Sequence, residues 1–271
     1  MPEGDTVWRT ARLLHDGLAG RVITRSDIRV PQWATLDLRG VTVDDAVSRG
    51  KHLFIRAGDV SLHTHLKMEG VWHVYPPSGR WRRPAHTARV VLENVDHQAV
   101  GFSLGLVEVL DRAAEDDAMA WLGPDLLGPG WSLDEAVRRV AADPERPVFL
   151  ALHDQRNLAG FGNEYVNEIC FLHGLLPTRP VGEVSDIGHV IERGRRLITM
   201  NCERVQRTFT DSTRGGPGGG AGPRAADSTA HWVFARDRHP CRRCGTTVQR
   251  GELGDDPLRR RDTFWCPHCQ T

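Results

Sequence analysis

Two Cys-x-x-Cys pairs near the end of the chain constrain its fold more than any other feature. Cys241 and Cys244 form the first pair, and Cys266 and Cys269 form the second after 21 intervening residues. Four thiolates at about 2.3 Å from the ion are the ligand set of a closed tetrahedral Zn²⁺ site. The spacing slightly exceeds the usual range of about 15 to 20 residues, and two turns of a β-hairpin would bring the pairs together. The sequence therefore predicts a structural Zn²⁺ in a hairpin over residues 231–271.

Other interpretations of these cysteines stay open. The pairs could form a redox site, or His239 or His268 could replace one cysteine as a ligand. Six cysteines in 271 residues are too few for a disulfide scaffold. Cys170 and Cys202 lie outside the pairs and are predicted to be buried apolar residues.

The first part of the chain combines one helix with a run of short strands. Apolar residues repeat at helical spacing near the N-terminus, with Asp5 or Thr6 placed to cap the helix and Gly20 placed to end it. From residue 21 to about 111, short apolar runs between Gly, Pro and Asp predict mostly antiparallel strands. We therefore expect residues 1–115 to form a helix-plus-β-sandwich domain.

A connection and a helical domain are expected next. Residues 116–131 combine acidic residues with repeated Gly-Pro breakers, which is typical of a linker. Residues 132–230 form the predicted helical domain, and Ser132 with Glu135 makes a capping box at its first helix. The segment RPVFLALHDQRNLAGFGNEYVNEICFLHGLLP indicates a helix, a glycine-bearing turn and a second helix.

Two predictions concern the end of that helical domain. Residues 185–208 are expected to form another helix. Between Asp211 and Ser228 glycine and proline leave no core-forming residues, which predicts a mobile loop.

The charge pattern restricts the partners of the protein. The net charge is zero, so a surface for nucleic acid must be a local patch. Lys51 and Lys67 are the only lysines among 35 basic residues, so each marks a place where a compact ammonium could be needed. No apolar stretch is long enough for a membrane span and the start is acidic, so we expect a cytoplasmic protein without membrane contact.

Arginines and aromatic residues alternate in the predicted zinc hairpin. Arg259, Arg260 and Arg261 precede Phe264 and Trp265. This composition suits contact with phosphate and insertion near a groove, and a solvated charged face is the alternative.

Pro2 gives the N-terminus a distinctive chemistry. Because the second residue is small, removal of Met1 is expected, which leaves the secondary amine of proline at the chain end. An α-amino group has a pKa near 8, and the positive end of the following helix favours its neutral, nucleophilic form. Glu3 is placed to donate or accept a proton, so the pair suits attack on a sugar carbon through an iminium. An ordinary lead-in to the helix is the alternative.

Four separated segments resemble the formamidopyrimidine-DNA glycosylase and endonuclease VIII family of base-excision repair enzymes. They are PEGDT at the start, GKHLF, FGNEYVNE and the hairpin ending CPHCQ, and they occur in the family's order over nearly the whole chain. The resemblance implies an α+β fold. In it, an N-terminal helix and an antiparallel β-sandwich precede a helical domain with a helix-two-turn-helix and a C-terminal zinc β-hairpin.

The resemblance also implies roles for individual residues. Pro2 is the expected Schiff-base nucleophile, and Glu3 the acid that helps to open the sugar. Lys51 is expected to contact phosphate and to assist proton transfer. Asn163 is expected to hold a phosphate at the helix-two-turn-helix, and Arg261 to contact phosphate near the lesion and to act in the later elimination.

Further positions match the family less directly. Met68 occupies the place of the wedge that fills the gap left by an extruded base, with core packing as the alternative. Gln155 and Glu168 match family positions as structural or lesion-proximal residues, whereas Lys67 has no clear counterpart. The RRFG loop of the purine-repair branch is replaced here by AVGFSLGLVEVL, so the sequence resembles the endonuclease VIII branch.

The resemblance thus implies a monomeric enzyme that acts on damaged DNA. It would remove oxidised bases, pyrimidines above all, as a glycosylase and nick the strand as an abasic-site lyase by beta/delta elimination. The alternatives are a non-catalytic zinc protein that binds damaged or branched DNA, and an RNA-associated zinc protein.

Overall fold

The computed structural model describes residues 2–209, 231–256 and 260–271. The chain divides into two compact units, Met1–Pro129 and Gly130–Thr271. The predicted mobile loop between Asp211 and Ser228 lies outside the described residues. Among the described residues, no helix has the length and apolar character required to cross a membrane.

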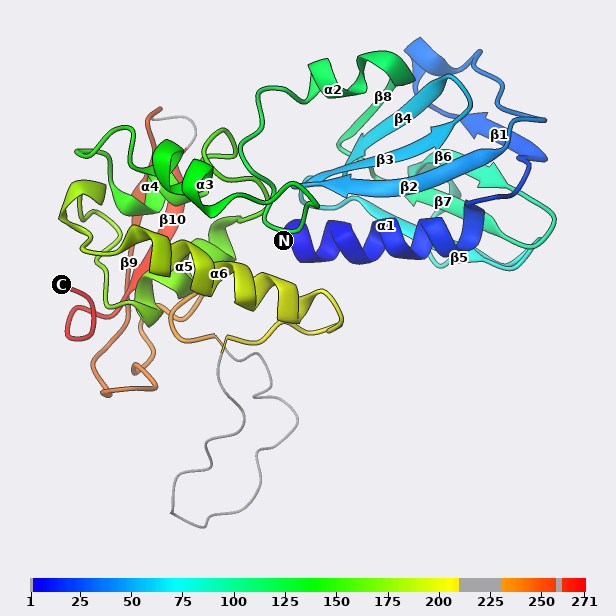
Figure 1. Cartoon of the computed structure of the whole chain (residues 1–271). Helices are drawn as coiled ribbons and strands as arrows, with labels where there is room; N and C mark the ends of the chain where they lie inside the picture. Colours follow the sequence, from blue (N-terminus) through cyan, green and yellow to red (C-terminus); the bar gives the residue numbers. More distant parts are fainter. Residues whose placement is uncertain (1, 210–230, 257–259) are drawn as a thin grey trace. The chain divides into compact units, whose positions relative to one another are not determined.

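The first unit contains a long helix and two four-stranded antiparallel sheets (Figure 1). One sheet has the order β1-β6-β7-β5 and the other the order β2-β3-β4-β8. The elements are α1 (Gly4–Leu18), β1 (Arg25–Ile28), β2 (Val43–Arg49), β3 (His52–Ala57), β4 (Val60–His65), β5 (Val71–Tyr75), β6 (Ala88–Glu93), β7 (Gln98–Phe102), β8 (Leu106–Asp111) and α2 (Glu115–Ala118). Short 3₁₀ turns span Pro31–Trp33, Ala85–Thr87 and Arg112–Ala114.

The apolar stripe of α1 packs into the core shared by both sheets. Leu14 and Leu18 are almost fully buried and lie in one cluster with Leu53 of β3, Leu62 of β4 and Leu92 of β6. Burial of apolar surface is the main free-energy gain of folding, so this cluster joins the helix and the two sheets into one unit.

The start of α1 differs from the sequence prediction. Glu3 is the N-cap residue, and the helix begins at Gly4, so the expected cap at Asp5 or Thr6 was wrong. The Asp5 side chain is fully buried, and its Oδ1 accepts the N–H of Thr6 at 2.7 Å from inside the first turn. The end agrees with the prediction, because Gly20 follows the helix with a φ of +73°, a left-handed conformation that glycine adopts without strain.

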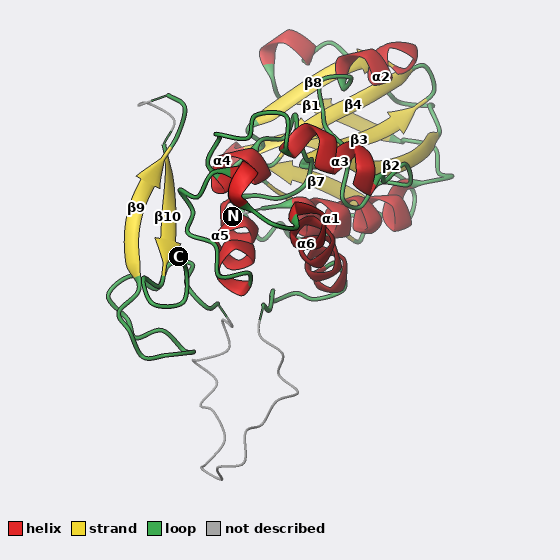
Figure 2. Ribbon diagram, turned by 60° about the vertical axis from the view of Figure 1, so that its left-hand side comes forward, coloured by secondary structure: helices red, strands yellow, loops and turns green. Residues whose placement is uncertain are grey.

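The second unit is helical and ends in a two-stranded hairpin (Figure 2). Its elements are α3 (Leu133–Val140), α4 (Val148–His153), α5 (Asn163–Leu172), a 3₁₀ turn at Val181–Glu183, α6 (Ile187–Asn201), β9 (Gln249–Leu253) and β10 (Arg261–Trp265). The helix predicted over 185–208 is real but shorter, since α6 ends at Asn201.

The N-cap predicted for α3 is confirmed. Ser132 Oγ accepts the N–H of Glu135 at 3.3 Å. The Glu135 carboxylate pairs with Arg138 and Arg139 on the same helix instead of completing a capping box.

The buried side of α1 generates a stability prediction. Leu14→Ala leaves a cavity where α1 meets both sheets, so the free energy of unfolding should fall by about 2–5 kcal/mol in urea denaturation. Leu13→Ala on the exposed side of the same helix is the control, and a change within about 0.5 kcal/mol is expected. Equal losses for the two variants would contradict this account of the core.

Candidate functional site

The first turn of α1 holds the two N-terminal residues of interest. Pro2 is half-buried and Glu3 is fully buried. Gly20 donates its N–H to the Val43 carbonyl at 2.8 Å, and Ala46 of β2 donates to His15 Nδ1 at 3.4 Å, so α1 runs antiparallel to β2. The first turn of α1 therefore points toward the end of β2, where the β2–β3 turn begins (Figure 1).

Lys51 lies in the two-residue turn between β2 and β3. Arg49 and His52 are paired across the hairpin, which leaves Gly50 and Lys51 as the turn. Gly50 has a φ of +56°, the conformation required at the first central position of a type II′ turn. The Gly50 N–H donates to Asp125 Oδ2 at 2.9 Å, so a contact from outside the hairpin also holds this turn.

Three histidines lie beside Lys51 on β3 and β4. His52 Nδ1 lies 2.8 Å from His63 Nε2, and His63 Nδ1 lies 3.1 Å from Glu108 Oε2. His52 and His65 are register partners with ring centroids 4.9 Å apart. A carboxylate only accepts, so Glu108 places the proton on His63 Nδ1, and His63 Nε2 then accepts from His52 Nδ1.

These imidazoles are neutral at neutral pH. Burial, assisted by the nearby charges of Lys67 and Lys51, lowers the pKa of His52 to about 3 and that of His65 to about 4. Burial also lowers the pKa of His63. Sequence analysis missed the cluster, although the alternation in HTH places His63 and His65 on one face of a strand.

Lys67 and Met68 occupy the loop after β4. Lys67 has a φ of +53°, and its N–H donates to His65 Nδ1 at 2.9 Å. Its side chain crosses Gly105 so closely that a Cβ there would lie 2.1 Å from Lys67 Cγ. Met68 is 67% exposed, which excludes core packing as its role.

In the second unit, α5 begins at Asn163 after a tightly held loop. The preceding Gly160 has a φ of +119° and donates its N–H to Gln155 Oε1 at 3.1 Å. Gln155 Nε2 donates to the carbonyls of His153 and Phe161 at 2.9 and 2.8 Å. Gln155 therefore shapes the loop that presents Asn163 through bonds to three backbone groups.

Buried polar side chains of α5 hold the segments around it. Glu168 is fully buried and accepts the backbone N–H groups of Trp232, Val233 and Phe234 at 2.8, 2.9 and 2.8 Å. Burial raises the pKa of Glu168, and the three N–H donors act in the opposite direction. Glu168 is thus a structural anchor.

Glu164 binds two residues that lie on either side of residues 210–230, which are outside the described residues. It pairs with Arg207 at 2.6 Å and His231 at 2.9 Å. Burial raises the pKa of Glu164, but the hydrogen bond from His231 and the charge of Arg207 outweigh burial and lower the pKa below its usual value.

Asn167 of α5 attaches the hairpin that carries Arg261. Its Oδ1 accepts the N–H of Phe264 at 2.6 Å, and its Nδ2 donates to the Asp262 carbonyl at 3.3 Å. Arg261 begins β10 and is exposed.

The aromatic residues of the hairpin behave differently from the sequence prediction. Phe264 is buried in one apolar cluster with Phe171, and its ring lies 5.4 Å from that of Phe234, so its predicted role near a DNA groove was wrong. Trp265 is half-buried against Gly251 of the paired strand, Arg260 is exposed, and Arg259 lies outside the described residues.

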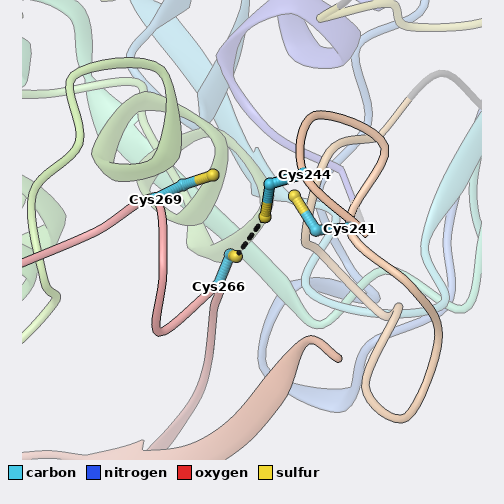
Figure 3. A group of neighbouring side chains, drawn as sticks. All are labelled: Cys241, Cys244, Cys266 and Cys269. Carbon is cyan, nitrogen blue, oxygen red and sulfur yellow. Dashed lines mark hydrogen bonds between the residues drawn. The ribbon is translucent and has the colours of Figure 1, made fainter. Parts of the chain in front are cut away.

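The four paired cysteines meet at the base of the hairpin (Figure 3). The Sγ atoms of Cys241, Cys244, Cys266 and Cys269 all lie within 4.8 Å of one another. The Cys244 and Cys266 sulfurs are 3.4 Å apart. Neither His239 nor His268 belongs to this group, so four thiols are positioned to bind one metal ion.

The other two cysteines are buried, as predicted. Cys170 lies inside α5 and Cys202 follows α6. Burial raises the pKa of the Cys170 thiol to about 12, which keeps it protonated and inert.

The sequence-predicted residues therefore fall into two groups. Pro2, Glu3, Lys51 and Met68 belong to the first unit. Asn163, Arg261 and the cysteines belong to the second.

Comparison with known proteins gives matches over the whole chain. Residues 1–103 match the family model of the formamidopyrimidine-DNA glycosylase N-terminal domain. The chain is 49% identical over 271 residues to the DNA-(apurinic or apyrimidinic site) lyase Nei2 of Mycolicibacterium smegmatis, covering 100% of this chain and 99% of the relative. It is 46% identical over 274 residues to endonuclease 8 2 of Mycobacterium bovis, covering 100% of both.

A solved structure shows the same fold. It is the formamidopyrimidine DNA glycosylase of Lactococcus lactis, bound non-covalently to DNA that contains an AP site. It matches with a TM-score of 0.77 and 19% identity, covering 99% of each chain. The predicted α+β fold is confirmed.

The buried carboxylate of α5 generates a prediction. Glu168→Gln replaces one acceptor oxygen by an NH₂ group that faces backbone donors, so stability should fall by about 1–3 kcal/mol. Thermal or urea unfolding measures the loss. Glu183→Gln at an exposed 3₁₀ turn is the control, and no loss in Glu168→Gln beyond that of this control would show that Glu168 is no anchor.

Proposed function

Because this chain belongs to the formamidopyrimidine-DNA glycosylase and endonuclease VIII family, in its endonuclease VIII-like branch, we propose that it is a bifunctional DNA glycosylase and abasic-site lyase. The two curated relatives reported above are named an abasic-site lyase and an endonuclease 8. The proposed substrate is DNA with oxidised bases, pyrimidines above all, and the protein acts in base-excision repair.

The observation that carries the proposal is that the residue directly after Pro2, at the start of α1, is a fully buried glutamate. Once Met1 is removed, the proline nitrogen is a secondary amine at the positive end of a 15-residue helix. This field disfavours the ammonium and leaves a lone pair for attack. Glu3 is the N-cap residue and fully buried, and we propose that its carboxyl serves the neighbouring amine as proton donor.

The proposed reaction forms and breaks bonds at one sugar carbon. The Pro2 nitrogen bonds to C1′ and gives up its proton, and the C1′–base bond breaks, with the electron pair leaving on the base, which takes up that proton. Glu3 donates a proton to the ring oxygen as the sugar opens, which leaves an iminium between Pro2 and C1′. The iminium acidifies C2′, and loss of that proton expels the 3′ phosphate. Water then releases Pro2 from the sugar fragment.

Other residues of the two units supply binding in this proposal. Lys51 holds a phosphate as a compact ammonium and exchanges a proton more readily than an arginine could. Met68 fills the space of the flipped base, and its 67% exposure on a held loop suits insertion. Asn163 at the start of α5 and Arg261 on β10 contact phosphates.

We further propose Zn²⁺ as the ion of the four cysteines. The donor set is all sulfur, and the separations within 4.8 Å match the roughly 3.8 Å between sulfurs of a tetrahedral Zn²⁺ site. Four protein ligands leave no open position, so the ion would supply structure and no chemistry. Cys241 and Cys244 precede β9 and Cys266 and Cys269 follow β10, so the ion would close the hairpin that carries Arg261.

Trapping the imine tests the reaction. Mature protein beginning at Pro2, incubated with borohydride and a duplex containing an abasic site or thymine glycol, should form a covalent adduct. Pro2→Gly keeps a terminal amine and should weaken trapping, whereas retained Met1 converts the proline nitrogen to an amide and should abolish it. Mass spectrometry of the adduct should place the sugar on the Pro2 nitrogen. A protein that binds the duplex without any adduct would instead be a non-catalytic binder.

Removal of one thiol tests the metal site. Cys241→Ala should lose the bound zinc and, with it, the ordered hairpin, so affinity for abasic-site DNA should fall. Zinc content by elemental analysis and binding by fluorescence anisotropy measure both effects. Cys202→Ala, outside the cluster, should keep its zinc. Full DNA affinity in a metal-free sample would contradict the proposed role.

A further inference from the structure

The turn that carries Lys51 depends on a carboxylate far along the chain. Asp125 Oδ2 accepts the Gly50 N–H at 2.9 Å, and its Oδ1 accepts the Leu127 N–H at 3.0 Å. Both oxygens of one side chain are thus used for backbone donors. One bond shapes the segment of Asp125, and the other reaches the β2–β3 turn 75 residues earlier.

The segment of Asp125 is itself fixed. Gly128 donates its N–H to the Asp125 carbonyl at 3.1 Å, and a Cβ on Gly128 would lie 2.9 Å from Asp125 Cβ. Leu126 is fully buried. The carboxylate therefore reaches Gly50 from a tight, anchored turn.

The Gly50 N–H needs this acceptor. Gly50 is buried, so its N–H without a hydrogen bond would carry a desolvation penalty. In a two-residue turn the closing bond joins the flanking residues, here Arg49 and His52, and leaves the first central N–H for an outside partner. The Asp125 bond fixes the Gly50 peptide and, with it, the direction in which the next residue leaves the turn.

We propose that Asp125 is a positioning residue that orients Lys51 for the reaction. This inference rests on the proposed function. Asp125 lies in the last segment of the first unit, between α2 and Pro129. In this role it holds the backbone that carries the ammonium and touches neither DNA nor the sugar. Without the bond the turn would relax, and Lys51 would sample orientations in which its ammonium misses the phosphate and the proton.

The experiment is a double-mutant cycle in the full-length mature protein. The four proteins are wild type, Asp125→Asn, Lys51→Ala and the double variant. The readout is the single-turnover rate of borohydride trapping on an abasic-site duplex, with affinity for a tetrahydrofuran-site duplex measured beside it. Asp125→Asn keeps one acceptor oxygen for the Leu127 turn and should trap about 10- to 100-fold more slowly. In the Lys51→Ala background the same change should matter by less than about twofold, because residues that act as one unit are not additive.

Two further variants guard against a purely structural effect. Asp125→Ser retains a hydroxyl that can close the Leu127 turn but is too short to bond Gly50, so it should trap as slowly as Asp125→Asn. Asp111→Asn is the matched control, since Asp111 Oδ1 accepts the Ala113 N–H at 3.0 Å in a turn of the same kind. It should trap at the wild-type rate. Thermal unfolding and zinc content verify that each variant is folded.

Different results would contradict the role of Asp125 and the proposed function. A wild-type rate in folded Asp125→Asn and Asp125→Ser would overturn the role of Asp125. An equal loss with and without Lys51 would also overturn it, because Asp125 would then act independently of that side chain. Absence of any adduct with the wild type would contradict the proposed function itself.

Discussion

The three backbone hydrogen bonds to the Glu168 carboxylate determine the arrangement of the second unit. A fully buried carboxylate is stable only when its oxygens are satisfied, and here the donors come from residues 232–234, more than sixty residues along the chain. Glu164 lies one turn earlier on α5 and binds Arg207 and His231. Asn167 directly precedes Glu168 and binds the backbone of β10. One short helix therefore places both the cysteine-bearing hairpin and the phosphate-binding candidate Asn163.

In the first unit, too, polar acceptors hold backbone N–H groups. Its sheets and α1 share an apolar core, but the turn with Lys51 and the loop with Met68 lie beyond that core at the ends of strands. Each is held by a specific polar acceptor: Asp125 for the Gly50 N–H and His65 for the Lys67 N–H. Apolar packing thus supplies stability, and single hydrogen bonds supply the local geometry that chemistry needs.

Sequence reasoning reached the fold and the cysteine cluster because those features are local patterns. Each of three patterns predicts a structure from a few neighbouring residues: the Cys-x-x-Cys pairs, the capping residue Ser132 and the glycine after α1. It missed what depends on pairing across long distances. Nothing local indicates that Asp125 would meet Gly50, or that Phe264 would be buried in one cluster with Phe171 instead of facing solvent. The N-cap was misplaced because Asp5 has a capping side chain but lies inside the first turn, where burial decides its partner.

The scarcity of lysine acquires a spatial meaning in the folded protein. Lys51 and Lys67 act on the same two imidazoles, His52 and His65, so every lysine of the chain is gathered at one end of the first unit. Reagents that acylate amines would therefore modify these two lysines and the N-terminal amine and would leave the arginine side chains unmodified. The fraction of protein labelled at Lys51 and Lys67 would then measure how far a bound molecule covers this end of the first unit.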